Sequence, residues 1–202
     1  SGISGSYASG QIAARQLREE FPARKLLLVD TYSSSLGEGL LVMRAVDCRR
    51  EGMSIDDTYT LLRSLRHRMA QIFTVGDLRY LRKTGRLSNL EAAVGTVLQI
   101  KPLLKGDPQG KIVCFAKIRG RQRAIEAIAQ RYAELVVEPE SQVIGIAHAD
   151  CEADAQILAS MLRRSRPPKD ILMVDYEPVT GSHVGPGALA LFFLSDENVR
   201  NI

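Results

Sequence analysis

Residues 100–117, IKPLLKGDPQGKIVCFAK, contain the signal that decides the fold. Two apolar runs, at residues 100–105 and 111–117, flank a DPQG turn at residues 107–110. Proline at the second turn position and glycine at the fourth are typical of a type I turn, so the pattern predicts two strands joined as a β-hairpin. A hairpin among alternating helices and strands indicates a mixed sheet.

Helices and strands alternate from the hairpin to the end of the chain. Apolar residues at helical spacing predict helices over residues 121–136 and 152–164. Short apolar runs between proline or polar breaks predict strands at residues 142–149, 171–176 and 188–194. With the hairpin, these elements predict an α/β domain with a mixed sheet over residues 71–202.

A strand and two helix starts are expected before the hairpin. The strand is predicted at residues 72–75, and Asp77 is expected to cap a basic helix that ends at Lys83. The sequence SNLE at residues 88–91 has the serine and glutamate of a capping box, which predicts one more helix.

The first 70 residues follow the order helix, strand, helix, helix. Helices are predicted at residues 8–21 and 36–50, and a third begins after Ser54 as its N-cap. The apolar run within residues 25–30 suits a strand that is buried on both faces of a parallel sheet. Because the chain starts inside a loop, we expect residues 1–70 to be the remainder of a first α/β domain, with its N-terminal part absent. The predicted fold class is therefore two α/β domains, a partial layer of parallel type followed by the mixed-sheet domain.

The composition is that of a globular protein. Hydrophobic residues make up 45% and charged residues 25% of the 202 residues, which argues against disorder. No apolar run approaches the roughly 20 residues that a membrane span requires, and no secretory signal precedes the first helix. We therefore expect a cytoplasmic protein without a membrane span.

The three cysteines, Cys48, Cys114 and Cys151, are widely spaced. None has a neighbouring cysteine or histidine at metal-ligand spacing, so we expect free thiols and no metal site.

Two segments have the composition of anion-holding turns. GSHVGPGA at residues 181–188 surrounds His183 with glycines, which let the backbone approach a ligand, and with a proline, which stiffens the turn. SGISGSY at residues 1–7 places hydroxyls and glycines before a helix, where the N-terminus can receive an anion. Two ordinary roles stay open, Ser4 as a simple N-cap and His183 as a turn residue bonded to backbone.

A serine and a histidine also raise the alternative of a Ser-His hydrolase that acts on acyl esters. The strained G-x-S-x-G turn of such enzymes is absent, and the sequence pairs no carboxylate with His183. His148 with Asp150 could form another catalytic pair, although we prefer a strand-end turn in contact with solvent.

Basic residues form two clusters, one at Arg79, Arg82, Lys83 and Arg86, the other at Lys117, Arg119, Arg121 and Arg123. With a net charge of +4, a basic nucleic-acid-binding module is the second alternative. Tryptophan is absent and no aromatic residues interleave with the basic ones, which counts against single-strand binding. A docking surface for an acidic protein partner fits at least as well, and scattered solvated cations remain possible.

Four segments, taken in order, resemble the DegV family of bacterial fatty-acid-binding proteins. SGSY at residues 4–7 resembles its L-S-G-T-Y segment, and residues 73–88 resemble its F-x-V-x-x-L-x-Y-L-x-x-x-G-R-I-S segment. IKPLL at residues 100–104 with KIRG at residues 117–120 resembles its I-K-P and K-x-R-G elements, and residues 181–193 resemble its closing G-T-H-T-G-P-G-A segment. Serine replaces threonine at Ser6 and Ser182, and both changes keep a hydroxyl.

The resemblance implies a two-domain α/β protein that binds one long-chain fatty acid between its domains and uses no cofactor. Ser4 would hydrogen-bond the carboxylate with help from the Gly5 amide, and His183 would approach it from the second domain. Ser6, Gly181, Ser182 and Gly185 would support the turns.

The family is also similar to the carrier subunits of bacterial fatty acid kinase. That likeness implies a binding protein without enzymatic activity of its own, which presents the carboxylate to a separate nucleotide-binding kinase subunit. Arg86 and Arg119 are the residues expected to dock that partner. Nucleic acid is not an expected partner.

Overall fold

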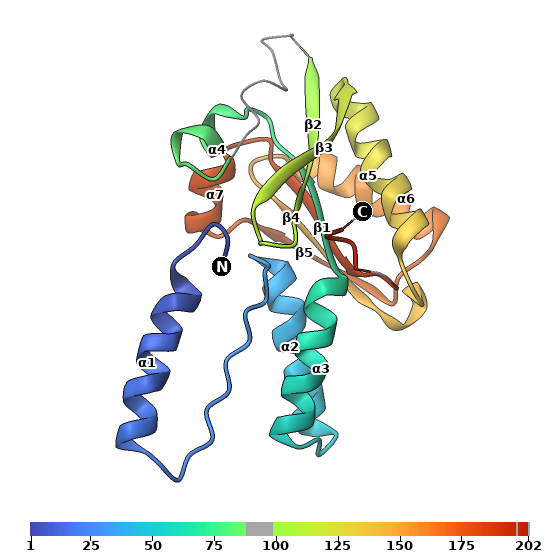
Figure 1. The fold of residues 1–202 in the computed structure, drawn as a ribbon. Coiled ribbons are helices and arrows are strands. Elements are labelled where there is room, and N and C mark those ends of the chain that lie inside the picture. Colours follow the sequence, from blue (N-terminus) through green and yellow to red (C-terminus); the bar gives the residue numbers. More distant parts are fainter. Residues whose placement is uncertain (88–98, 197, 202) are drawn as a thin grey trace.

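The computed structural model describes residues 1–87, 99–196 and 198–201 (Figure 1). Within them the chain forms seven α-helices and one six-stranded sheet. The strands are β1 (Met69–Thr74), β2 (Ile100–Gly106), β3 (Ile112–Arg119), β4 (Val143–His148), β5 (Asp170–Asp175) and β6 (Leu189–Leu194). The predicted capping box at residues 88–91 lies outside the described residues.

The sheet has the order β3-β2-β1-β6-β4-β5 and is mixed, as predicted. Only β4 and β5 run parallel, and the other neighbours are antiparallel. The β2–β3 hairpin is confirmed, and the Asp107 carboxylate closes its turn by accepting the Gln109 and Lys111 amides at 2.9 and 2.8 Å. This Asp107 contact shows why the turn could be predicted from a few adjacent residues.

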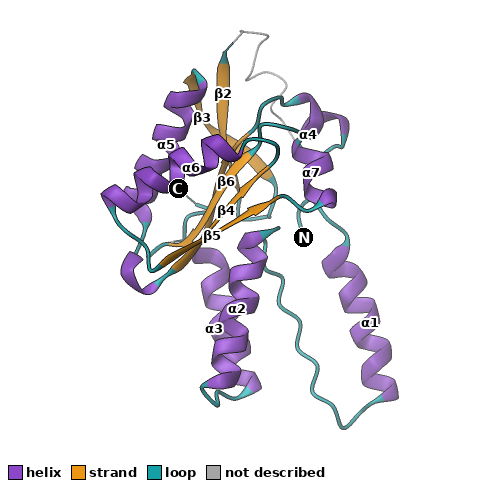
Figure 2. Ribbon diagram, turned by 180° about the vertical axis from the view of Figure 1, so that it is seen from behind, coloured by secondary structure: helices purple, strands orange, loops and turns teal. Residues whose placement is uncertain are grey.

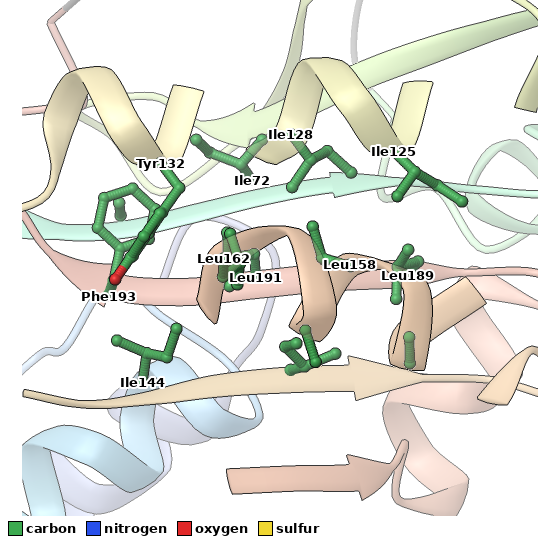
Figure 3. Packing of buried hydrophobic residues seen from close by; sticks show 14 of the residues in the cluster. Ile72, Ile125, Ile128, Tyr132, Ile144, Leu158, Leu162, Leu189, Leu191 and Phe193 are labelled. Carbon is green, nitrogen blue, oxygen red and sulfur yellow. The ribbon is translucent and has the colours of Figure 1, made fainter. Parts of the chain in front are cut away.

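Helices α5 (Arg121–Leu135) and α6 (Glu152–Ser165) bury one face of the sheet in the main hydrophobic core (Figure 3). Alternate residues of β6, among them Leu191 and Phe193, point to this side, as the period of a strand requires. The Tyr132 ring of α5 meets Phe193 edge-on at 5.1 Å, and its hydroxyl donates to the Arg166 carbonyl at 2.9 Å. Burial raises the pKa of Tyr132 to about 12.

Helix α2 (Leu36–Arg50) packs against the opposite face, and α3 (Ile55–Arg68) packs beside α2. The intervening β6 residues, Ala190 and Phe192, contact Leu36 and Leu40 on this side. Gly145 of β4 is needed there, because a Cβ atom would come within 2.9 Å of the Leu36 side chain. The α2 helix is confirmed with its predicted bounds, as is the Ser54 cap of α3, whose hydroxyl accepts the Asp57 amide at 3.1 Å.

Helix α1 (Ser6–Glu20) stands apart from α2 and α3, and the extended segment after it runs between them (Figures 1 and 2). The strand predicted at residues 25–30 is wrong, because the segment has no ladder partner among the described strands and is only partly buried. A strand exists only where a neighbour takes its backbone hydrogen bonds, and an apolar run cannot supply that neighbour. Leu28 lies instead beside Gly10 of α1, where a Cβ atom would be 3.3 Å from it.

Two short helices, α4 (Arg79–Lys83) and α7 (Pro178–Val184), contact each other beyond the ends of the strands. Asp77 accepts the Arg79 amide at 2.8 Å, but the predicted cap is wrong by one residue, because Leu78 holds the N-cap position of α4 without a side-chain bond. The predicted glycine turn around His183 is wrong in its first half, because residues 181–183 are helical. Pro178 occupies the start of α7, and Gly185 ends it with a φ of 72°.

Candidate functional site

A cavity of about 500 Å³ lies on the α2 side of the sheet. Its walls come from the start of α1, the extended segment, α7 and strands β1 and β6. Cavities of this size hold ligands as large as drug molecules or cofactors. Ser4, Ser6 and His183, which the sequence placed in two separate anion-holding turns, all line it.

The greater part of the remaining wall is apolar. It includes Ile3, Leu28, Val29, Phe73, Leu81, Ile112, Tyr176, Val179, Val184 and Phe192. Burial raises the pKa of the Tyr176 phenol, so this ring stays neutral across the physiological range. This wall suits a ligand with a long apolar chain.

Ser4 and Ser6 place two hydroxyls at the start of α1. Their Oγ atoms lie 2.9 Å apart, and the Ser6 amide donates to Ser4 Oγ at 3.2 Å. Ser4 is therefore not the N-cap, a position held by Gly5 without a side-chain bond. Because the first-turn amides of a helix have no intrahelical partner, this end of α1 can receive an anion beside the two hydroxyls.

His183 lies in the last turn of α7, and its side chain is half-buried. Its Nδ1 atom is buried without a hydrogen-bond partner among the described residues, so the open alternative of a histidine whose Nδ1 bonds to backbone fails. A buried nitrogen without a partner is costly. The Nδ1 atom itself has no exposed surface, and the imidazole lines the cavity through its other atoms.

The glycines and Ser182 near His183 have structural contacts of their own. A Cβ atom at Gly185 would lie 2.4 Å from the Tyr80 ring, so this glycine lets α4 pack closely. The Ser182 hydroxyl donates to the Val179 carbonyl at 2.8 Å within α7. Neither residue lines the cavity, and neither do Gly5 and Gly181.

The two arginines expected to dock a partner differ in position. Arg86 is half-buried and lines the cavity, where its Nη1 atom donates to the Thr84 carbonyl at 2.5 Å. Arg119, at the end of β3, is exposed. Arg119 is therefore the more accessible of the two.

Sequence reasoning missed the loop of residues 30–35 as part of the site. Thr31, Tyr32, Ser33, Ser34 and Ser35 all line the cavity. Ser35 also donates to the Glu177 carboxylate at 3.2 Å, which joins the loop to the start of α7. The signal in the sequence was a run of five hydroxyl residues directly after an apolar segment.

His148 lies beside a different carboxylate from the Asp150 considered in the sequence. His148 is buried, and its Nδ1 atom lies 3.3 Å from Asp175, not paired with Asp150. No described carboxylate forms an ion pair with His183, so a Ser-His-acid arrangement is missing from this part of the chain.

The described residues contain neither a metal site nor a membrane-spanning helix. No group of three histidine, cysteine, aspartate or glutamate residues is placed to hold a metal ion there. No helix in this same part of the chain is long and apolar enough to cross a bilayer.

Comparison with known sequences identifies relatives over nearly the full chain. The family model described as "Uncharacterised protein, DegV family" matches residues 1–196. A DegV domain-containing protein of Clostridium perfringens is 41% identical over 196 residues, which are 97% of this chain and 67% of that protein.

Solved structures share the fold. The fatty acid binding DegV family protein of Streptococcus agalactiae is 32% identical, with a TM-score of 0.84 over 97% of this chain and 68% of that one. A DegV family protein of Ruminococcus gnavus refined with vaccenic acid is 26% identical, with a TM-score of 0.88 over 95% and 68%. The fatty acid kinase B3 protein of Streptococcus pneumoniae, loaded with linoleic acid, is 24% identical, with a TM-score of 0.86 over 96% and 68%.

Proposed function

Because this chain belongs to the DegV family, we propose that it binds one long-chain fatty acid in the cavity on the α2 side of its sheet. The observation that carries the proposal is one cavity whose lining combines an apolar wall with Ser4, Ser6 and the imidazole of His183. A fatty acid has the matching parts, one carboxylate and one apolar tail. The relatives from S. agalactiae and R. gnavus, which bind fatty acids, support it.

The tail supplies the larger share of the binding free energy. Each buried methylene contributes about 0.8 kcal/mol, so a sixteen-carbon tail contributes on the order of 10 kcal/mol before ordering costs. A hydrogen bond to a charged carboxylate contributes about 1.5–3 kcal/mol. The polar residues therefore orient the guest and keep its charge from being buried without partners.

Ser4 and His183 hold the carboxylate in this proposal, with Ser6 and the first-turn amides of α1 beside them. A Cβ atom at Gly5 would meet nothing within 4 Å, so no described atom covers this side of Gly5. Arg86, which lines the same cavity, adds a positive charge near the anion.

The protein acts as a carrier in this proposal and not as an enzyme. It presents the bound carboxylate to a separate nucleotide-binding kinase subunit, a role supported by the fold shared with the S. pneumoniae kinase protein. Arg119 is the exposed docking residue, and Arg86 acts inside the cavity. We place the protein in the cytoplasm, where such a kinase finds its nucleotide.

Residues 1–70 belong, in this proposal, to a first domain that further polypeptide completes. The extended segment at residues 26–29 has no strand partner among the described residues, and Ile12 and Phe21 of α1 are exposed. The C. perfringens relative, of which this chain spans 67%, is long enough to supply a partner strand. Residues 71–202 form the second domain.

Lipid extraction tests the binding proposal. Protein purified under native conditions, extracted and examined by mass spectrometry, is expected to release one long-chain fatty acid per chain. Ser4→Ala and His183→Ala are expected to weaken binding about tenfold to a hundredfold, since each removes one charged hydrogen bond. Both are expected to abolish phosphorylation of the acid by the kinase subunit.

A matched control is Ser182→Ala, whose hydroxyl bonds only within α7. This variant should keep its lipid and its phosphorylation. If the wild-type chain neither carries lipid nor takes up added fatty acid, the proposed function is wrong.

A further inference from the structure

The loop of residues 30–35 forms one wall of the cavity in a conformation that needs support. Two of its residues, Tyr32 and Ser35, have φ angles of 52° and 50°. Side chains with a Cβ atom rarely adopt positive φ, and such residues persist only where their surroundings hold them. Whatever anchors this loop therefore also fixes the cavity wall.

Arg200 donates hydrogen bonds that anchor this loop. Its side chain reaches inward from the C-terminal end of the chain, and the residue is 3% exposed. Its Nη2 atom donates to the Tyr32 carbonyl at 2.7 Å and to the Ser33 hydroxyl at 3.3 Å. The same guanidinium reaches the carbonyls of Asp107 and Arg66, both at 3.4 Å. One side chain thus joins the loop to the β2–β3 turn and to α3.

The Tyr32 ring and the loop backbone are held from several directions. The Arg66 guanidinium lies 4.7 Å from the ring centre, that of Arg200 lies 5.6 Å away, and the His67 ring lies 5.5 Å away. Arg66 Nη1 also donates to the Asp30 carbonyl at 3.0 Å, and Gln71 donates to the Tyr32 carbonyl at 2.9 Å. The loop has little freedom while these contacts last.

Arg200 serves this anchor and forms no ion pair with a described residue. No described carboxylate lies within ion-pair distance of its guanidinium, and its partners are three carbonyls and one hydroxyl. Burial lowers the pKa of Arg200 to about 10, so it remains a cation at neutral pH. A planar guanidinium donates in several fixed directions, whereas a lysine ammonium cannot reproduce that fork.

We propose that Arg200 is a positioning residue for the ligand, which holds the loop of residues 30–35 closed against the cavity and so slows release of the bound fatty acid. The inference rests on the proposed function. It concerns the wall of the cavity and leaves the carboxylate contacts at Ser4 and His183 unchanged. Loss of the anchor should therefore speed both entry and release of the guest.

The test compares Arg200→Lys with Arg68→Lys. Arg68 is the matched control because it donates to the Ser195 carbonyl at 2.8 Å and lies 3.9 Å from Asp196, with no cavity residue among these partners. Stopped-flow exchange of a fluorescent long-chain fatty acid measures release, and thermal unfolding measures stability. Arg200→Lys is expected to release the probe about tenfold faster, as the loss of a charged hydrogen bond predicts, and Arg68→Lys to stay within about twofold.

Thermal unfolding reports any general loss of stability separately, because Arg200 is buried whereas the Arg68 side chain is 36% exposed. Release from Arg200→Lys at the wild-type rate, or equal acceleration by Arg68→Lys, would overturn the inference. If Arg200→Lys does not fold, Arg66→Lys removes the second anchor and is expected to speed release about threefold. Wild-type release from Arg66→Lys would then overturn it.

Hydrogen exchange of the loop separates this inference from the proposed function. The amides of residues 31–35 should exchange faster in Arg200→Lys than in the wild type or in Arg68→Lys, whether or not a fatty acid binds. A wild-type chain that takes up no probe would refute the proposed function alone. An unchanged exchange rate in Arg200→Lys would refute the anchor.

Discussion

The two faces of the sheet differ in how completely they are filled. On the α5–α6 face, alternate residues of β6 meet isoleucines and leucines of both helices in a fully buried core (Figure 3). On the α2 face, the neighbouring β6 residues meet a few side chains of α2 and then the 500 Å³ cavity. One face holds the chain together, and the other leaves room for a guest whose burial completes the packing.

The comparison has a thermodynamic consequence. A closely packed core is destabilised by any change in side-chain volume. A side chain that lines a cavity already lacks packing contacts on one side, so its truncation costs less stability. A ligand that fills the open face is expected to stabilise the fold in proportion to its concentration above the dissociation constant. Stability and binding should therefore respond to different residues of the same strand.

The largest expected effect comes from the adjacent pair Phe193 and Phe192, which are 0% and 2% exposed on opposite faces. Phe193→Ala is expected to lower the free energy of unfolding by about 3–5 kcal/mol, because it empties a packed site against Tyr132. Phe192→Ala should cost about half as much and should instead weaken fatty-acid binding. Urea unfolding and ligand titration of both variants measure the difference.

Equal losses of stability from the two phenylalanine variants would show that both faces are equally packed. If Phe193→Ala weakened binding more than Phe192→Ala, the fatty acid would have to lie on the α5–α6 face of the sheet. Either result would break the comparison.

A smaller effect on stability is expected from the ionisation of Tyr132 on the α5–α6 face at high pH. Burial raises the pKa of Tyr132 from its ordinary value of 10 to about 12. In the unfolded chain this phenol ionises near pH 10, while the folded state keeps it neutral, so its stabilising contribution is complete below pH 10 and is lost as the pH rises toward 12. The loss is on the order of 3 kcal/mol, since the shift is about two pKa units and each unit corresponds to about 1.4 kcal/mol.

Tyr132→Phe isolates this contribution from other groups that titrate at high pH. The unfolding free energy of the wild type should fall relative to that of the variant between pH 10 and pH 12, as measured by urea unfolding at each pH. A constant difference over that range would mean that the phenol is not buried against α6.

Local signals in the sequence predicted much of the fold. The DPQG turn, the Ser54 cap and the helical spacing of α2 each depend on residues within one or two turns of the chain. They identified the hairpin, the mixed sheet and most helices within a few residues. His183 and Ser4 were found because glycines and hydroxyls gather around them in the sequence.

The features that the sequence did not predict correctly depend on contacts between residues far apart in the chain. The apolar run at residues 25–30 needed a partner strand, which no local pattern can supply. The strain at Tyr32 and its anchor Arg200 come from parts of the chain 168 residues apart. Gly185 was assigned to a ligand turn, although its absent Cβ atom makes room for Tyr80.

The smallest expected effect concerns the outer side of α2, where Val42 is 56% exposed. Val42→Ser should change the unfolding free energy of this chain by less than about 0.5 kcal/mol, because an exposed side chain has little packing to lose. In a longer polypeptide of the relatives' length, the same change should cost more, since the proposed first domain would cover α2 there. Urea unfolding of both forms measures the two values, and equal values would show that further polypeptide leaves this side of α2 in solvent.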